Sequence, residues 1–342
     1  MTNNPAADWL DDVLRRIPAG RVAVFGDFCV DAYWMIDTDE SELAVETGLP
    51  VRRVREQRYG LGGAGNVGAN LAALGVGNVT AVGLIGDDPF GRQLLDLLAD
   101  IGVDAKGVLA CQPDWQTPVY AKPRIGSRET NRIDFGGFNR IAPSSVDRMV
   151  ELLSQTAETS DAMILNQQLP AGVSTAAMIE RINGVIAAHT DCTFIVDSRH
   201  RGELYQCAAL KVNSHESARI CGRQIPVDQA VSDEETRRFA ERLREQRGKP
   251  VFITCGESGI IVAHEDGVDA AAGIHVDGMI DTVGAGDTVA AALAAALAVD
   301  ANVLTAARLA NVAASVTIRK LGTTGVASPA EMRAAAKEAG AT

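Results

Sequence analysis

The strongest chemical signal in the sequence is a glycine-rich run placed directly before an alanine-rich segment. The run is Asp281-Thr-Val-Gly-Ala-Gly-Asp287, and residues 288–297, which follow it, have high helix propensity. Small residues at the start of a helix let backbone N–H groups converge on an anion, which the helix dipole also favours. Gly284, Ala285 and Gly286 are therefore predicted to form an anion hole.

Asp287 places a carboxylate beside this predicted anion hole. The arrangement suits phosphoryl transfer, because the amides would hold the migrating phosphoryl group while Asp287 accepts the proton of an attacking hydroxyl group. Asp287 is therefore the predicted general base. The alternative is that Asp287 only caps the following helix.

A second glycine run, residues 60–68, contains the spacing GxGxxG twice. A helix and a strand are expected after it, and Asp87 lies where a ribose-binding acid would be expected, so an NAD(P)-dependent oxidoreductase is an alternative. That fingerprint requires a buried strand before the glycines, whereas Arg52, Arg53, Arg55 and Arg58 occupy this stretch. The second run therefore favours a dinucleotide site much less than the first run favours phosphoryl transfer.

The elements that must position these residues alternate along the chain. Apolar runs predict strands at residues 21–26, 79–85, 162–165, 193–196, 251–254 and 260–262, and helical patterns lie at 66–74, 90–101, 174–188 and 233–246. This alternation predicts an α/β fold with a central, mostly parallel sheet flanked by helices. We expect one domain over residues 1–342.

Two charged, extended segments, residues 51–59 and 117–135, interrupt this alternation. The second contains Gly126-Ser127, which is typical of a hairpin turn. Because such strands do not suit the interior of a parallel sheet, they are predicted to form a small inserted antiparallel β lid, with strands within about residues 33–60 and 114–137. Exposed strand edges need cover, so we expect the lid to mediate a homodimer.

The composition favours a small-molecule protein. Of the 342 residues, 46% are hydrophobic, and 32 basic residues against 44 acidic ones give a net charge of −12, which disfavours nucleic acid and anionic membranes as partners. The six cysteines are scattered without close pairs, and residues 1–12 contain no apolar leader segment. The longest apolar run, residues 289–299, is too short to span a bilayer. We therefore expect a cytoplasmic protein.

Several motifs together resemble those of the ribokinase/PfkB sugar kinases, over nearly the whole chain and in the order of that family. They are Gly62-Gly-Ala-Gly-Asn66, Gly86-Asp-Asp-Pro-Phe-Gly91, Asn213-Ser-His-Glu216, Thr254-Cys-Gly-Glu-Ser-Gly259 and Asp281–Asp287. Within the family, residues 26–34 and 320–324 are most similar to D-glycero-β-D-manno-heptose 7-phosphate kinases. Two stretches depart from relatives: Asp197-Ser-Arg199 replaces an Asp-Pro-Lys run, and Asn166-Gln-Gln168 replaces a sugar-contacting glutamate. Since no nucleotidyltransferase half follows Thr342, we expect a kinase alone.

The resemblance implies a ribokinase-like fold that transfers the γ-phosphoryl group of ATP, with Mg²⁺, to a hydroxyl group of a sugar or sugar phosphate. Asp287 would be its base and Gly284, Ala285 and Gly286 its anion hole. The sugar would contact Asp31, Gly62, Gly63 and Asn66. The nucleotide would contact Asn213, Thr254, Gly256, Gly259 and Asn311. Glu216 would hold Mg²⁺ through water, and Asp281 would belong to a loop that binds a monovalent cation such as K⁺.

Charge in the predicted lid suggests that the acceptor already carries a phosphate. Residues 52–58 contain four arginines against Glu56, and residues 122–134 are basic as well. A sugar hydroxyl network needs no such charge, whereas a phosphate distant from the reacting hydroxyl needs guanidinium groups to hold it. Arg53 and Arg55 are the predicted ligands. The alternatives are a ribokinase- or fructokinase-like kinase of a free sugar, and charges that only keep exposed strand edges from aggregating.

Overall fold

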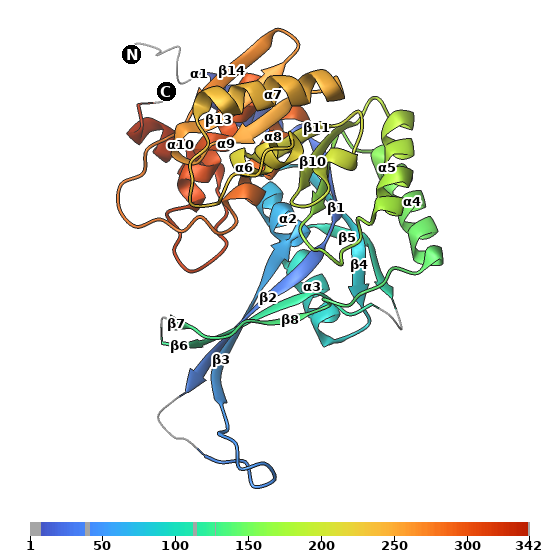
Figure 1. Cartoon of the computed structure of the whole chain (residues 1–342), viewed down its shortest axis with the longest axis vertical. Coiled ribbons are helices and arrows are strands. Elements are labelled where there is room, and N and C mark those ends of the chain that lie inside the picture. The colour runs from blue at the N-terminus through green and yellow to red at the C-terminus, as the bar shows by residue number, and fades with distance from the viewer. Residues whose placement is uncertain (1–7, 38–41, 112–114, 127, 341–342) are drawn as a thin grey trace.

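The strands of the main body join into one large sheet whose interior is parallel. The computed structural model describes residues 8–37, 42–111, 115–126 and 128–340 (Figure 1). Its nine-stranded sheet has the order β14-β13-β12-β11-β10-β9-β1-β4-β5, with parallel pairing from β5 to β12 and antiparallel pairing of β13 and β14. These strands are β1 (Arg21–Gly26), β4 (Asn78–Gly86), β5 (Asp104–Cys111), β9 (Ala162–Gln167), β10 (Thr193–Ser198), β11 (Ala209–Asn213), β12 (Val251–Thr254), β13 (Gly259–His264) and β14 (Gly267–Ala272).

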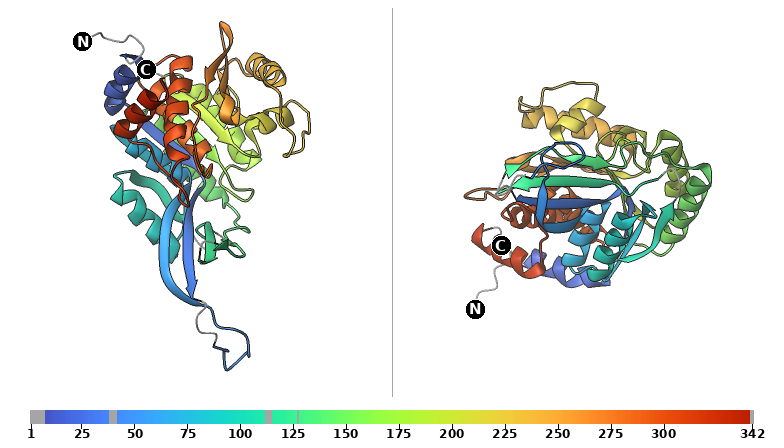
Figure 2. Two further views of the ribbon diagram at one scale, coloured as in Figure 1. Left: turned by 90° about the vertical axis from the view of Figure 1, so that its left-hand side faces the viewer. Right: turned by 90° about the horizontal axis from the view of Figure 1, so that it is seen from below.

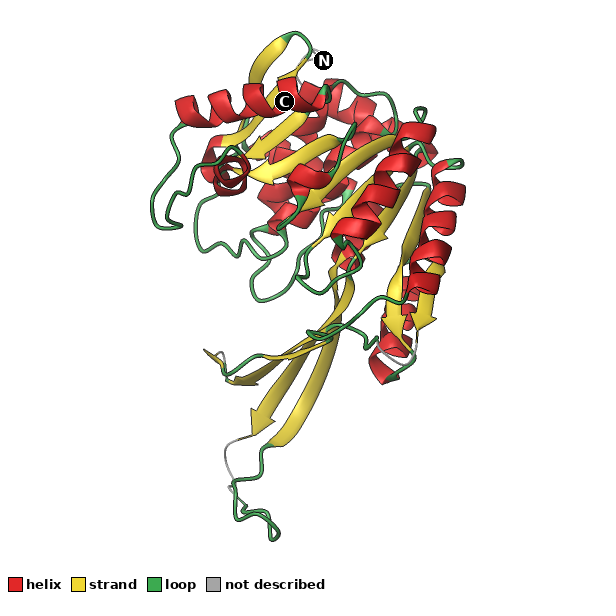
Figure 3. Cartoon of the chain, turned by 45° about the vertical axis from the view of Figure 1, so that its right-hand side comes forward, coloured by secondary structure: helices red, strands yellow, loops and turns green. Residues whose placement is uncertain are grey.

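Helices cover both faces of this sheet (Figure 3). One face packs against α1 (Asp8–Arg16), α2 (Ala64–Ala73), α3 (Pro89–Asp100), α8 (Ala285–Leu297), α9 (Val303–Thr317) and α10 (Pro329–Glu338). The other packs against α4 (Pro143–Ala157), α5 (Ala176–Ala188), α6 (Ser214–Ile220) and α7 (Asp233–Arg247). Successive strand residues such as Val24 and Phe25 enter opposite cores, so the strands are apolar on both sides. The predicted α/β fold is confirmed.

A second, smaller sheet projects from one end of the body (Figures 1 and 2). Its order is β3-β2-β6-β7, and β8 also pairs with β6. The strands are β2 (Phe28–Asp37), β3 (Arg53–Gly63), β6 (Val119–Ile125), β7 (Arg128–Glu129) and β8 (Ile133–Phe135). We call these strands and the segment 42–52 the lid.

The prediction that the lid is antiparallel is wrong for its central pair, because β2 and β6 run parallel. β2 continues from β1 with only Asp27 between them, so the lid inherits the direction of a strand of the parallel sheet. The remaining pairs of the lid are antiparallel. Of the predicted hairpin turn, Gly126 lies between β6 and β7, and Ser127 lies outside the described residues.

Asp27 ties the lid to the body at the point where β1 becomes β2. Its buried carboxylate accepts hydrogen bonds from the backbone N–H groups of Gln168, Leu169 and Val173 at 2.8–2.9 Å. Its carbonyl oxygen accepts the N–H of Ala64 at 3.0 Å, which fixes the first turn of α2. Burial raises the pKa of Asp27 to about 6, although the three backbone donors oppose this shift.

Gly63 joins β3 to α2 in a conformation that a side chain would not tolerate. Its φ is +54°, and a Cβ atom there would lie 2.4 Å from the carbonyl oxygen of Asp27. This close approach sets the angle between the lid and α2, and α2 in turn packs against α8 through a hydrogen bond of 2.9 Å from Thr288 Oγ1 to Asn70 Oδ1. Gly63 therefore fixes the orientation of the lid relative to α2 and, through α2, relative to α8.

One face of the lid packs against α3 of the body through aromatic rings. Phe90 of α3 packs against Tyr59 of β3 and Phe135 of β8, with ring centroids 6.3 and 5.5 Å apart. The opposite face of the lid carries Asp31.

No helix in the described part of the chain has the length and apolar character needed to cross a membrane.

We expect Gly63→Ala to lower the free energy of unfolding by about 3 kcal/mol or more, because the added methyl group meets backbone at a positive φ. Gly68→Ala, within α2, is the matched control: its Cβ would lie 3.8 Å from Val103 Cγ2, an ordinary contact, and alanine favours a helix over glycine by up to about 1 kcal/mol. Urea denaturation measures both. Equal stability of the two variants would contradict the account of this junction.

Candidate active site

The predicted anion hole is the N-terminus of α8. Gly284 is the N-cap residue with a φ of +81°, and its carbonyl oxygen accepts the N–H of Thr288 at 3.0 Å. The N–H groups of Gly286 and Asp287 belong to the first turn, where a helix supplies no carbonyl partner of its own. The N–H of Ala285 already donates to Thr282 at 3.2 Å, so Gly286 and Asp287 supply the donors best placed to receive an anion.

Asp287 lies in the first turn of α8 and faces α2. Its Oδ2 accepts a hydrogen bond of 2.7 Å from Nδ2 of the buried Asn66. Burial, followed by the nearby charge of Asp197, raises the pKa of Asp287 to about 7, although Asn66 and Lys211 act in the opposite direction. A carboxylate with this pKa can accept a proton near neutral pH. The alternative of a simple cap does not fit, because the N-cap residue is Gly284.

The residues predicted to contact the sugar meet where the lid joins the body. Asp31 of β2 is buried, and a Cβ at Gly62 would lie 3.5 Å from its Cγ. Gly63 begins the turn into α2, which carries Asn66. Asp31 Oδ1 also pairs with Lys122 Nζ at 2.9 Å, a contact between β2 and β6 that the sequence did not indicate.

A row of buried polar side chains lies in the sheet below the N-terminus of α8. Asn166, Asp197 and Lys211 are register partners on β9, β10 and β11. Lys211 Nζ lies 3.0 Å from Asp197 Oδ1, and Asn166 Nδ2 donates to Asp197 Oδ2 at 3.4 Å. Sequence reasoning missed Lys211. Its signal was a lysine inside an apolar strand, two residues before Asn213.

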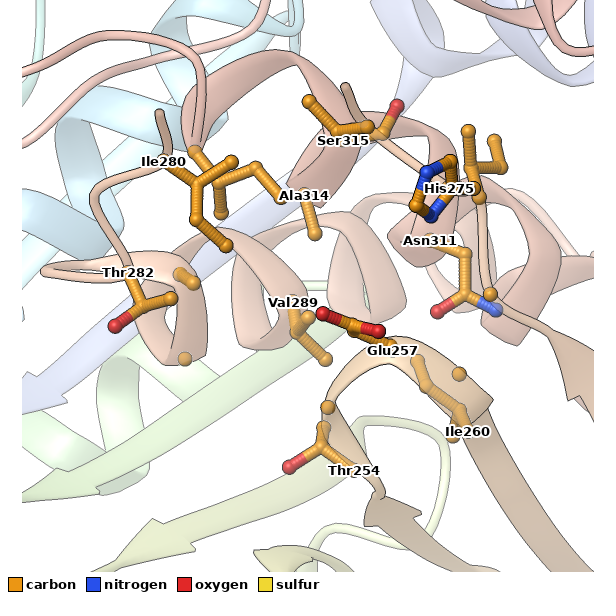
Figure 4. Close-up of a pocket in the computed structure, with 18 residues that line it drawn as sticks. Thr254, Glu257, Ile260, His275, Ile280, Thr282, Val289, Asn311, Ala314 and Ser315 are labelled. Atoms are coloured by element: carbon orange, nitrogen blue, oxygen red, sulfur yellow. The ribbon is translucent and has the colours of Figure 1, made fainter. Parts of the chain in front are cut away.

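Two cavities meet at the start of α8. The polar one, of about 610 Å³, is lined by Gln168, Asp197, Arg199, Lys211, Glu216 and Asp287, among others. The apolar one, of about 370 Å³, is lined by Ile260, Ile280, Val289 and Ala314 (Figure 4). Thr254, Thr282 and Gly286 line both. A molecule with a flat apolar end and an anionic tail could therefore reach Asp287 from the apolar cavity.

The apolar cavity also contains most of the predicted nucleotide residues. Thr254, Gly256, Gly259 and Asn311 line it. The amide nitrogen of Asn311 donates to the carbonyl oxygens of Ala271 and Ala272 at 2.9 and 3.0 Å, so this side chain holds β14 against α9 at the cavity wall.

Asn213 and Glu216 form a capping box at the start of α6. Glu216 Oε2 accepts the N–H of Asn213 at 2.9 Å, and Asn213 Oδ1 accepts the N–H of Glu216 at 2.8 Å. Asn213 is therefore the N-cap residue of α6, and Glu216 lies in the first turn. Both line the polar cavity, and burial raises the pKa of Glu216.

Asp281 organises the loop before α8. Its two carboxylate oxygens accept the N–H groups of Val283 and Gly322 at 3.0 and 2.9 Å, and its own N–H donates to Ile318 at 2.8 Å. The segment after α9 is thereby held beside the approach to α8.

Arg53 and Arg55 are not brought to this site. Arg53 pairs with Glu42 at 2.8 Å, and Arg55 pairs with Asp37, in the outer part of the lid. Asp37 is six residues along β2 from Asp31, or roughly 20 Å. The register instead places Arg58, Lys122 and Arg124 on the face of Asp31.

The first glycines of the second run, Gly60, Gly62 and Gly63, end β3 of the lid, and the others lie in α2. Because β3 is a lid strand and not a strand of the parallel sheet, the context that a dinucleotide fingerprint requires is missing.

Comparison with known sequences identifies relatives of this chain. A family model described as pfkB family carbohydrate kinase matches residues 20–330. The chain is 31% identical over 307 residues to the "Bifunctional protein HldE" of Gluconobacter oxydans, a match that covers 89% of this chain and 62% of that protein. It is 30% identical over 318 residues to the "D-beta-D-heptose 7-phosphate kinase" of Bordetella bronchiseptica, covering 90% and 94% respectively. The chain thus spans less than two thirds of that bifunctional relative.

Solved structures share the fold. Phosphofructokinase-2 from Escherichia coli in complex with potassium has a TM-score of 0.73 at 18% identity, with 94% of this chain and 99% of that chain covered. Ribokinase from Arabidopsis thaliana complexed with ribose and ATP has a TM-score of 0.71 at 19% identity, with 93% and 99% covered. The fold is therefore ribokinase-like, as predicted.

Proposed function

This chain belongs to the pfkB family of carbohydrate kinases, and we propose that it transfers the γ-phosphoryl group of ATP to a hydroxyl group of a sugar phosphate of the heptose 7-phosphate class. The observation that carries the proposal is the position of Asp287. Its carboxylate is held by Asn66 at 2.7 Å and lies in the first turn of α8, where the apolar and polar cavities meet at Gly286. We propose that the base and the anion hole act at this boundary, where the phosphates of a nucleotide in the apolar cavity would enter the polar one.

In the proposed reaction, the acceptor hydroxyl oxygen attacks the γ-phosphorus atom and forms the new P–O bond. The bond between that phosphorus and the bridging oxygen of ADP breaks, and its electron pair leaves with ADP. The hydroxyl proton passes to a carboxylate oxygen of Asp287. The first-turn N–H groups of α8 stabilise the charge on the transferred phosphoryl oxygens.

The adenine would occupy the apolar cavity between Ile260 and Ile280, with Asn311 at its wall. Its triphosphate would pass Thr254 and reach Gly286, which both cavities share. The proposal is supported by the nucleotide residues of the sequence prediction, since Thr254, Gly256, Gly259 and Asn311 line the apolar cavity and Asn213 lines the polar one.

Cation sites follow from the same chemistry. Glu216 would bind Mg²⁺ through water, and the ion shields the charge of the nucleotide phosphates when bound. Among the described residues there is no group of three or more His, Cys, Asp or Glu that could hold a metal. Because both carboxylate oxygens of Asp281 accept backbone N–H groups, we propose that Asp281 orders a loop whose carbonyl oxygens bind K⁺.

The proposed acceptor phosphate is supported by the register of the lid. Arg58 and Lys122 are partners of Tyr33, and Arg124 is the partner of Met35, so all three basic residues lie on the Asp31 face. Arg199 lines the polar cavity that also contains Asp287. Lys122, Arg124 and Arg199 are better placed than Arg53 and Arg55 to hold a phosphate on a sugar bound at Asp31.

A homodimer through the lid is the proposed assembly. Leu43, Val45 and Leu49 are exposed at the outer end of the lid, where Val45 is 95% exposed, and Phe138 is 99% exposed beyond β8. Exposed apolar side chains on segments that project from the body are typical of an interaction surface, and we propose that a second lid covers them. The cytoplasmic location stays a prediction from the sequence.

We expect kcat/KM to fall about tenfold per pH unit below pH 7 and to be constant above it, because the pKa of Asp287 is raised to about 7 and only its ionised form accepts the proton. Asp287→Asn should reduce kcat by about 10²–10⁴-fold and leave ATP binding intact. Coupled measurement of ADP release over pH 5–9 tests both. Near-normal turnover of Asp287→Asn would refute its role as the base.

For the acceptor, we expect kcat/KM to be higher for a heptose 7-phosphate than for the free heptose. Arg124→Gln should lower the value for the phosphate about 10- to 100-fold and that for the free sugar much less, because a charge-assisted hydrogen bond is lost. Arg53→Gln is the matched control, since Arg53 pairs with Glu42 far from Asp31. If the free sugar is the better substrate and Arg124→Gln leaves kcat/KM unchanged, a ribokinase- or fructokinase-like kinase is favoured.

For the assembly, we expect sedimentation equilibrium to give twice the 36.0 kDa of one chain. The double variant Val45→Asp/Leu49→Asp should shift the protein to the monomer, because charges at the lid tip resist burial. Val227→Asp, at a side chain 90% exposed outside the lid, should leave the dimer intact. A wild-type monomer at working concentration would exclude the dimer.

A further inference from the structure

A buried lysine lies directly below the first turn of α8. Neither the sequence motifs nor the role of Asp287 as the base explains why a lysine occupies this position. Lys211 of β11 is 6% exposed, and a Cβ atom at Gly286 would lie 3.0 Å from its Nζ. We propose that Lys211 is a catalytic residue whose ammonium group binds the phosphoryl group during its transfer. This inference rests on the proposed kinase function and adds a side-chain cation to the backbone donors of α8.

Burying the ammonium group of Lys211 costs free energy of desolvation, which an interaction with that charge must offset. This lysine occupies a strand in which Ala209, Leu210 and Val212 enter the apolar cores, and its register partner on β10 is Asp197. A buried ion pair of this kind is often no more stable than two apolar side chains of similar volume. Stability alone therefore does not explain why a lysine and an aspartate stand at the end of the sheet that faces α8.

The geometry leaves the ammonium group available to a substrate. Among the described residues, the hydrogen-bond partner of Lys211 Nζ is Asp197 Oδ1 at 3.0 Å. Asp197 accepts one N–H, which leaves two donors for phosphoryl oxygens. Lys211 and Gly286 both line the polar cavity that contains Asp287, so a phosphoryl group held by the N–H of Gly286 would also lie within reach of the ammonium.

Asp197 is the positioning residue for Lys211. Burial would lower the pKa of Lys211, but Asp197, together with Glu216 and Asp287, outweighs it and raises the pKa, so the lysine stays charged. Asp197 is in turn held by Asn166 at 3.4 Å. During transfer Lys211 keeps its protons and stabilises the charge on the phosphoryl oxygens, whereas the hydroxyl proton goes to Asp287.

Lys211→Met tests the proposal, because methionine keeps the length and apolar character of the lysine stem. We expect kcat to fall about 10²–10³-fold, the effect of removing one oriented donor from a developing anion. Without acceptor sugar, the Kd of a non-hydrolysable ATP analogue should rise about tenfold in calorimetric titration, whereas the Kd of ADP should stay unchanged. Lys106→Met, at an exposed lysine of β5, is the matched control and should match the wild type in all three values.

A pH profile separates this role from a merely structural one. Lys211 lowers the pKa of Asp287 and Asp197 raises it. The acidic limb of kcat/KM should therefore move to higher pH in Lys211→Met and to lower pH in Asp197→Asn. If Lys211→Met fails to fold, Lys211→Met/Asp197→Asn removes both buried charges and serves in its place.

A kcat within threefold of the wild type, with an unchanged preference for the ATP analogue over ADP, would overturn the proposal in either variant. The titrations need no acceptor, so they also separate the two hypotheses. A wild type that binds the analogue in a Lys211-dependent way but phosphorylates no sugar would refute the proposed function and support the phosphoryl site.

Discussion

The hydrogen bond between Asn66 and Asp287 is the contact on which the site depends, because it joins the first turns of α2 and α8 at 2.7 Å. Each helix begins at a glycine with positive φ, Gly63 or Gly284, and each glycine lies against a polar group of another element. The two helices are further joined by Thr288 and Asn70. A carboxylate, an amide side chain and a helix N-terminus thus converge at one place.

Burial raises the pKa of the Asp287 carboxylate into the range in which it can accept a proton near neutral pH. Asp287 has a pKa raised to about 7 because it is buried and because Asp197 lies nearby, and Lys211 limits the shift. The charges belong to one set: Asp197 keeps Lys211 protonated, and Lys211 keeps Asp287 from becoming a still weaker acid. In a medium of low effective dielectric constant such interactions act strongly over several ångströms. The charges of Asp197 and Lys211 in the sheet therefore influence the pKa of the base on α8.

The lid continues directly from the main sheet, since β2 follows β1 with only Asp27 between them. The carboxylate of Asp27 holds the segment 168–173, its carbonyl oxygen holds the start of α2, and Asp31 stands four residues further along the same strand. Substrate contacts on the lid are therefore connected to the reacting groups through a short stretch of backbone and two buried carboxylates.

The sequence alone determined the alternation of strands and helices, the helix after Asp281–Asp287 and the lid as a charged, extended insertion, because these depend on local periodicity and glycine placement. Only the tertiary structure decided which charged residues share a site. Lys211 meets Asp197 and Lys122 meets Asp31 through strand register, whereas Arg53 and Arg55 pair with acids at the outer lid. Composition revealed a basic lid, but a shift of one residue moves every side chain to the other face. Register is set by the packing of whole strands that are distant in the chain, so no local pattern contains it.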